Sequence, residues 1–214
     1  MHTTKKQKQI IYGAVILSML GTMVWFGYSW RQKSIQELAF KAFAESLEEL
    51  QTGLITASSS GTDTKQLWED VERAFKVGFE QHGNSTLAPF FLAFQASALA
   101  KQGKTQEALL VLTDAVQKMP KKSPLYFAYA TKLALLQIDC DDQATQEVGH
   151  AALQDLAENR NNPQRAMALY YQGYLAWVAN NKPMYENAWT TLIEIAGKDS
   201  VWTQLVSSHI NFLA

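Results

Sequence analysis

Residues 89–120 read PFFLAFQASALAKQGKTQEALLVLTDAVQKMP, and this stretch decides the fold of the chain. On both sides of Gly103 the apolar residues recur at steps of three and four, which is the spacing of an amphipathic helix. Pro89 stands where a helix can begin and Pro120 where one must end, because proline lacks the backbone N–H that a helix interior requires. The stretch therefore predicts two antiparallel helices joined by a tight turn at Gly103.

The same helical periodicity continues outward from this pair. No segment alternates apolar and polar residues for long, and no Asn-Gly or Asp-Gly turn is present, so no strands are expected. Short connections make neighbouring helices antiparallel. The first helix is expected to end at Gly53 and to be followed by a polar linker at residues 57–64. The expected helices are 33–51, 64–82, 86–102, 105–119, 124–138, 142–159, 164–180, 183–196 and 200–213.

Composition excludes several classes of protein. Of the 214 residues, 47% are hydrophobic and 18% are charged, which is too apolar for a disordered chain. A single cysteine, Cys140, excludes a disulfide scaffold. The formal net charge of −1 provides no overall basic field, so nucleic acid is not an expected partner.

An uncharged apolar segment, IIYGAVILSMLGTMVWFGYSW, occupies residues 10–30. At about 1.5 Å of rise per residue it reaches about 30 Å, the thickness of the hydrocarbon layer of a bilayer. Trp25, Tyr28 and Trp30 crowd one end, where aromatic rings sit among lipid headgroups. A cleaved signal peptide is the alternative, but its apolar stretch would be shorter and small residues would follow it. We therefore predict an uncleaved transmembrane helix at residues 10–30.

The flanking charges favour one orientation of this anchor. Lys5, Lys6 and Lys8 precede the segment, whereas Arg31 and Lys33 follow it. The excess on the N-terminal side predicts a cytoplasmic N-terminus and, in a bacterium, a periplasmic body held at the inner membrane. The predicted organisation is a basic tail at 1–9, a transmembrane helix at 10–30, a stalk helix and linker at 31–63, and a helical domain at 64–214.

The helix pairs recur at close to 34 residues, which is the period of the tetratricopeptide repeat. In residues 89–120 the second helix resembles that pattern through its small–large–small–proline order, and the first helix resembles it through a small residue between two large ones. The positions concerned are Leu92, Ala96, Leu99, Ala108, Leu112, Ala115 and Pro120. The pattern implies an all-α fold in which helical hairpins stack into an α-solenoid.

Two further units resemble the repeat less closely. In the second unit we assign the small positions of the second helix to Ala144 and Ala151, which keep a seven-residue step. In the third unit Gly173 takes the small position of the first helix. The terminal helix 200–213 is expected to cap the array.

The basic tail, single apolar span, stalk and degenerate repeats together resemble one bacterial family. Its members are single-pass inner-membrane proteins with a periplasmic tetratricopeptide-like domain, described as ancillary subunits of the Sec translocon. The resemblance covers nearly the whole chain and is strongest over residues 84–116 and 168–194. It implies association with the translocon and with periplasmic chaperones, and a role in handing over exported proteins.

No pattern of catalytic or metal-binding residues is found in the sequence. The acidic loop Asp139-Cys140-Asp141-Asp142 lacks the spaced ligands of a calcium loop, and its aspartates would raise the pKa of the thiol. We interpret this loop as solvated, with an aspartate that caps the next helix. Gly-rich phosphate loops, nucleophile elbows and paired metal-binding histidines are absent from the sequence. We therefore expect no enzyme activity, catalytic residues, metal site, cofactor or small-molecule substrate.

One set of side chains is a candidate for a protein-binding groove on the inner wall of the solenoid. Aromatic residues suit such grooves because they give large contact areas at a small entropic cost. The alternative is that these residues form the core between repeats. The set comprises Phe127, Thr131, Leu135, Met167, Tyr170, Tyr174 and Trp177.

Two functional hypotheses remain open from the sequence. The first is a membrane-anchored adaptor for protein–protein interaction that assists handover of exported proteins at the Sec translocon, together with periplasmic chaperones. The second is a cell-envelope or division scaffold, or assembly factor, that uses the same repeats.

Overall fold

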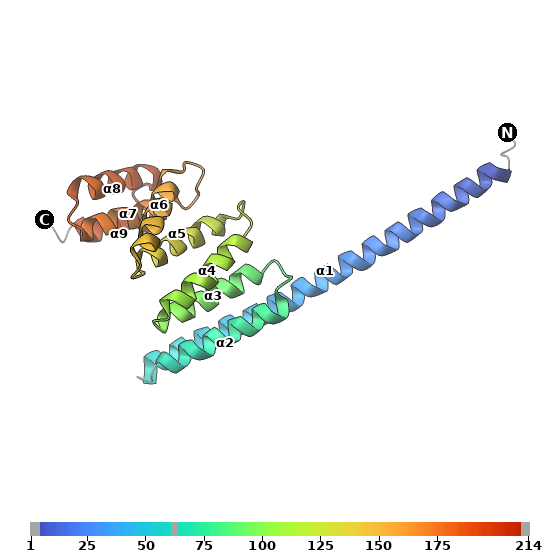
Figure 1. Cartoon of the computed structure of the whole chain (residues 1–214), viewed down its shortest axis with the longest axis horizontal. Coiled ribbons are helices and arrows are strands. Elements are labelled where there is room, and N and C mark those ends of the chain that lie inside the picture. Colours follow the sequence, from blue (N-terminus) through green and yellow to red (C-terminus); the bar gives the residue numbers. More distant parts are fainter. Residues whose placement is uncertain (1–4, 61–63, 211–214) are drawn as a thin grey trace.

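The computed structural model describes the backbone of residues 5–60 and 64–210, and the side chains of residues 22–23, 25–56 and 64–209. Within these ranges every regular element is a helix, and Figure 1 shows α1 projecting from a stack of shorter antiparallel helices. The predicted all-α class is therefore confirmed for this part of the chain, and the body is solenoid-like. The helices are α1 (Lys5–Ser60), α2 (Thr64–His82), α3 (Ala88–Lys101), α4 (Thr105–Lys118), α5 (Pro124–Ile138), α6 (Gln143–Glu158), α7 (Arg165–Val178), α8 (Lys182–Ala196) and α9 (Val201–Ile210).

The ends of α2 to α8 agree with the predicted bounds to within two residues, because local sequence signals set them. Pro124 begins α5, and the Ser123 hydroxyl accepts the backbone N–H of Leu125 at 3.3 Å. Asp142 caps α6 by accepting the backbone N–H of Thr145 at 2.8 Å, as interpreted from the sequence. These caps satisfy N–H groups that lack a partner in the first turn of a helix. For the last predicted helix, 200–213, residues 211–213 lie outside the described part of the chain.

The prediction that the first helix ends at Gly53 is wrong, because α1 continues to Ser60. Residues 57–60 of the predicted linker 57–64 are therefore helical, and residues 61–63 lie outside the described ranges. A Cβ atom at Gly53 would collide with the side chain of Leu67 in α2. The glycine thus permits a close approach of α1 and α2 and does not act as a helix terminator.

The backbone of α1 runs through the predicted transmembrane segment 10–30 and into the predicted stalk without a break. Side chains of residues 10–21 and of Val24 lie outside the described ones. Among the described residues, no helix is both long enough and apolar enough to cross a membrane.

The C-terminal half of α1 belongs to the packed body. Phe43 of α1 lies edge-on to Phe91 and Phe94 of α3, with ring centroids 5.0 and 5.5 Å away, and Phe75 of α2 completes the group. Such pairs add about 0.5–1.5 kcal/mol each beyond the area that they bury. This aromatic group joins α1, α2 and α3 into one unit.

Two further clusters of buried side chains extend the core from α3 to α9. The first joins α3, α4 and α5, and the second joins α5 to α9, so that each hairpin packs on the next. The main members of the first are Leu92, Ala93, Ala96, Leu112, Ala115, Val116 and Met119, and those of the second include Leu153, Leu169, Trp189, Leu192 and Val206.

The assignment of Ala144 and Ala151 as the small positions of α6 is wrong, because both side chains are exposed. Gly149 makes the close contact instead, since a Cβ atom there would lie 2.7 Å from the carbonyl oxygen of Ala134 in α5. Leu153, four residues later, is buried. In the next hairpin a Cβ atom at Gly173 would collide with the side chain of Trp189. This close contact agrees with the assignment of Gly173 as a small position.

Candidate protein-binding surfaces

The seven predicted groove residues lie on two helices that the fold brings together. Phe127, Thr131 and Leu135 are on α5, whereas Met167, Tyr170, Tyr174 and Trp177 are on α7. Thr131 is fully buried, and Met167 and Tyr170 are each only 8% exposed. The other four residues are half-buried.

The aromatic residues of α7 pack against the terminal helix α9. Nε2 of His209 lies 3.1 Å from the hydroxyl oxygen of Tyr170, within hydrogen-bond distance. The His209 ring also lies 5.1 Å from that of Trp177 and 5.5 Å from that of Tyr174, measured between centroids. Burial raises the pKa of Tyr170, and Tyr171 and Tyr174 add to the effect. In the described structure, α9 therefore covers part of the predicted stripe.

The α5 part of the stripe is also engaged with the rest of the body. The Thr131 hydroxyl donates to the carbonyl oxygen of Phe127 at 2.9 Å, and Leu135 packs against the cluster that joins α5 to α9. Partial exposure remains at Phe127, Leu135, Tyr174 and Trp177. That a partner binds this stripe stays a prediction.

A second surface lies where α1, α2, α3 and α5 meet, and it encloses a cavity of about 210 Å³. We call it the Tyr129 groove. It is mostly apolar and aromatic, with one exposed cation and one exposed hydroxyl. Its lining residues are Leu50, Trp68, Val71, Phe94, Ser97, Tyr129 and Lys132.

Local contacts hold the walls of the Tyr129 groove in place. The Gln102 side-chain amide donates to the carbonyl oxygen of Trp68 at 2.9 Å, which ties α3 to α2. The ammonium of Lys132 lies over the Tyr129 ring, 5.0 Å from its centroid, in a cation–π contact. Burial raises the pKa of Tyr129 above its ordinary value.

This arrangement suits one class of ligand better than others. At about 210 Å³ the cavity is smaller than the roughly 300–1,000 Å³ of common small-molecule sites. It can accept an apolar side chain of another protein, while Lys132 at the rim can meet a carboxylate beside that side chain. Shape and charge therefore favour a short apolar segment of a protein that carries an acidic group.

Sequence reasoning missed this groove although it expected a protein-binding groove on the inner wall of the solenoid. Phe94 and Ser97 on α3, and Tyr129 and Lys132 on α5, share a spacing of three residues that could have marked it. α5 is apolar around most of its circumference because it packs on α4, α6 and α7. Periodicity alone therefore does not show which face of α5 remains open.

The acidic loop between α5 and α6 has a structural role, and its described side chains do not form a metal site. Cys140 is buried, its thiol lies 3.3 Å from the carbonyl oxygen of Leu136, and burial together with Asp139, Asp141 and Asp142 raises its pKa. Hydrogen bonds from Thr145 lower the pKa of Asp142. Over the described part of the chain, no three His, Cys, Asp or Glu side chains converge as metal ligands.

No protein-family model matches this chain, and no curated protein matches it either. Function is therefore inferred from the fold and from the two surfaces.

Proposed function

We propose that this chain is a membrane-anchored adaptor that binds other proteins through its stacked helical hairpins. The Tyr129 groove is the observation that carries this proposal, because it is an open apolar cavity of side-chain size with a cation at its rim. Exposed apolar sites bordered by polar groups are typical of surfaces that bind proteins.

The packing supports a tetratricopeptide-like body. Repeats of this class bury little surface alone, so they stack and leave an extended wall free for partners. In the hairpin of α3 and α4, every helical position assigned to the repeat pattern is at most 6% exposed. These positions are Leu92, Ala96, Leu99, Ala108, Leu112 and Ala115.

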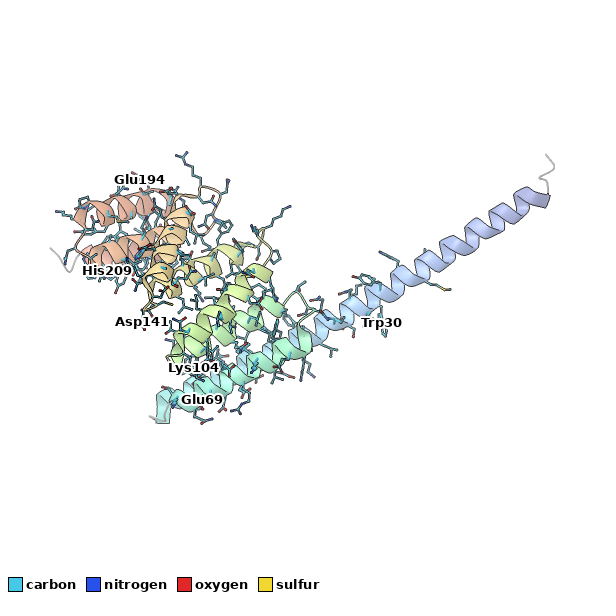
Figure 2. The ribbon with its side chains drawn as sticks, in the orientation of Figure 1. Trp30, Glu69, Lys104, Asp141, Glu194 and His209 are labelled. Atoms are coloured by element: carbon cyan, nitrogen blue, oxygen red, sulfur yellow. The ribbon has the colours of Figure 1, made fainter. Side chains whose placement is uncertain are left out.

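The exposed aromatic residues of α1 support attachment to a membrane. Trp25, Phe26, Tyr28 and Trp30 are between 63% and 76% exposed on the part of α1 that leaves the body, and Figure 2 labels Trp30 there. The amphipathic rings of Trp and Tyr are favoured at the level of lipid headgroups. The proposed anchor is the apolar segment 10–30, with a cytoplasmic N-terminus and, in a bacterium, a periplasmic body at the inner membrane.

The proposed partners are exported proteins, the Sec translocon that releases them and periplasmic chaperones. A chain that emerges from a translocon is not yet folded, so it presents apolar segments of the kind that the Tyr129 groove can bury. An anchored body would meet these segments close to the membrane. The family resemblance of the sequence supports the same assignment.

The proposal is tested by filling the groove. Ser97 is exposed and lines the cavity, so Ser97→Trp places a large ring there without replacing a buried residue. Gln117→Trp, at an exposed position on α4, is the matched control. Each full-length variant is purified from membranes, and the proteins that accompany it are quantified by mass spectrometry.

We expect Ser97→Trp to lower the recovery of translocon subunits and exported proteins at least tenfold, while Gln117→Trp retains them. Both variants should melt within about 2 °C of the parent, since neither position is buried. Unchanged recovery with Ser97→Trp would exclude the groove as the binding site. Recovery of envelope or division proteins in place of the translocon would favour the scaffold hypothesis.

A further inference from the structure

The body presents one edge toward the free segment of α1. α2 is antiparallel to α1, so its C-terminal end points back toward the N-terminal, free segment of α1. The connection between α2 and α3 therefore lies on the side of that free segment. The later hairpins repeat this path, and Figure 1 shows the α4–α5 and α6–α7 connections on the same side. We call the residues of these two connections, 119–123 and 159–164, the proximal edge.

A hydrogen-bonded contact fixes the position along α1 at which this side of the body lies. The backbone N–H and the hydroxyl of Thr86, in the α2–α3 connection, both donate to Oε1 of Gln36, at 3.0 and 2.8 Å. Gln36 lies six residues after Trp30, which corresponds to about 9 Å along a helix. If Trp30 marks the headgroup level, the contact at Gln36 lies about 9 Å from it, close to the Debye length of about 8 Å at physiological salt.

The charges of the body differ between this side and the opposite one. Lys121, Lys122 and Arg160 are exposed on the proximal edge, and residues 119–123 contain no carboxylate. The α5–α6 connection on the opposite side carries the acidic loop, and Figure 2 shows Asp141 and Lys104 far from Trp30. The proximal edge that faces the anchor therefore carries only cations, whereas the opposite side carries the aspartates together with the exposed Lys104.

We propose that the proximal edge binds the anionic lipid headgroups of the bilayer that holds α1, through Lys121, Lys122 and Arg160. This inference rests on the proposed anchor. Basic residues near an anionic surface are attracted to it over about a Debye length, and each one that comes that close strengthens the attachment several-fold. The contact would hold the body against the membrane, and free rotation about α1 would be lost.

The test uses the full-length chain in vesicles of phosphatidylcholine alone and in vesicles that also contain phosphatidylglycerol. A membrane-impermeant acetylating reagent modifies exposed lysines, and mass spectrometry gives the modification of Lys121 and Lys122 relative to Lys104. Lys104 serves as the internal control because it is exposed on the side away from Trp30. Extraction with alkaline carbonate measures separately whether the chain stays in the membrane.

We expect the ratio to fall at least threefold in the anionic vesicles and to recover at high salt, because salt screens the attraction. An equal ratio in both vesicles, with the chain retained after carbonate treatment, overturns the lipid contact and leaves the anchor standing. Release of the chain by carbonate overturns the anchor, and the lipid contact with it.

Discussion

At the scale of single residues, glycines set how closely several pairs of neighbouring helices approach. Gly53, Gly78, Gly149 and Gly173 each face a side chain or backbone atom that leaves no room for a Cβ atom. At Gly149 one of the neighbours is a backbone carbonyl oxygen, which cannot rotate away as a side chain can. The contact between α5 and α6 therefore depends on this glycine.

Gly149→Ala should destabilise the body although alanine is the better helix former. The gain in helix propensity is up to about 1 kcal/mol, whereas overpacking of a close contact costs about 1–3 kcal/mol. We expect a lower melting temperature in circular dichroism. Gly27→Ala is the control, because nothing lies within 4 Å of a Cβ atom there. A Gly149→Ala protein that melts at or above the parent temperature would show that the contact is looser than described.

Cys140 provides a second residue-scale prediction. Its side chain is buried, and burial and the neighbouring aspartates raise its pKa, so little thiolate forms at pH 8 in the folded chain. Since the thiolate is the reactive form, a thiol reagent should react at least about tenfold faster after denaturation than before it. Reaction should accelerate as pH rises toward the raised pKa. Equal rates in the folded and unfolded chain would contradict the described environment of Cys140.

At the scale of elements, helix ends could be predicted from sequence and helix orientation could not. Proline and capping residues are local signals, so Pro124 and Asp142 locate the starts of α5 and α6. Which face of a helix stays open depends on its neighbours in space. For this reason the predicted stripe includes the fully buried Thr131 and omits Tyr129.

The terminal helix α9 covers part of the stripe, and its attachment to the body gives a prediction at this scale. Val206 is fully buried in the cluster that joins α5 to α9, whereas its neighbour Leu205 is 38% exposed. Val206→Asp buries a charge without a partner and should detach α9, whereas Leu205→Asp should not. Amide hydrogen exchange should then increase in α9 for Val206→Asp alone. Equal exchange in both variants would mean that α9 is not held by this contact.

At the scale of the whole molecule, the fold follows from features spread along the chain. Every hairpin needs a neighbour to cover its apolar face, so the hairpins stack in the order of the sequence. This order and the all-α class could be predicted from periodicity and turns. The inclusion of α1 in the body could not, because the contacts of Phe43 with α3 join residues far apart in the sequence.

The most direct test of the central claim is photocrosslinking from the Tyr129 groove in living cells. A photoreactive phenylalanine replaces Tyr129 in the full-length chain, and the same residue at Leu110, which is 73% exposed on α4, is the control. The adaptor account predicts discrete adducts with translocon subunits or exported proteins from position 129 that Ser97→Trp abolishes, and none from position 110. Equal adducts from both positions, or none from position 129, would contradict it.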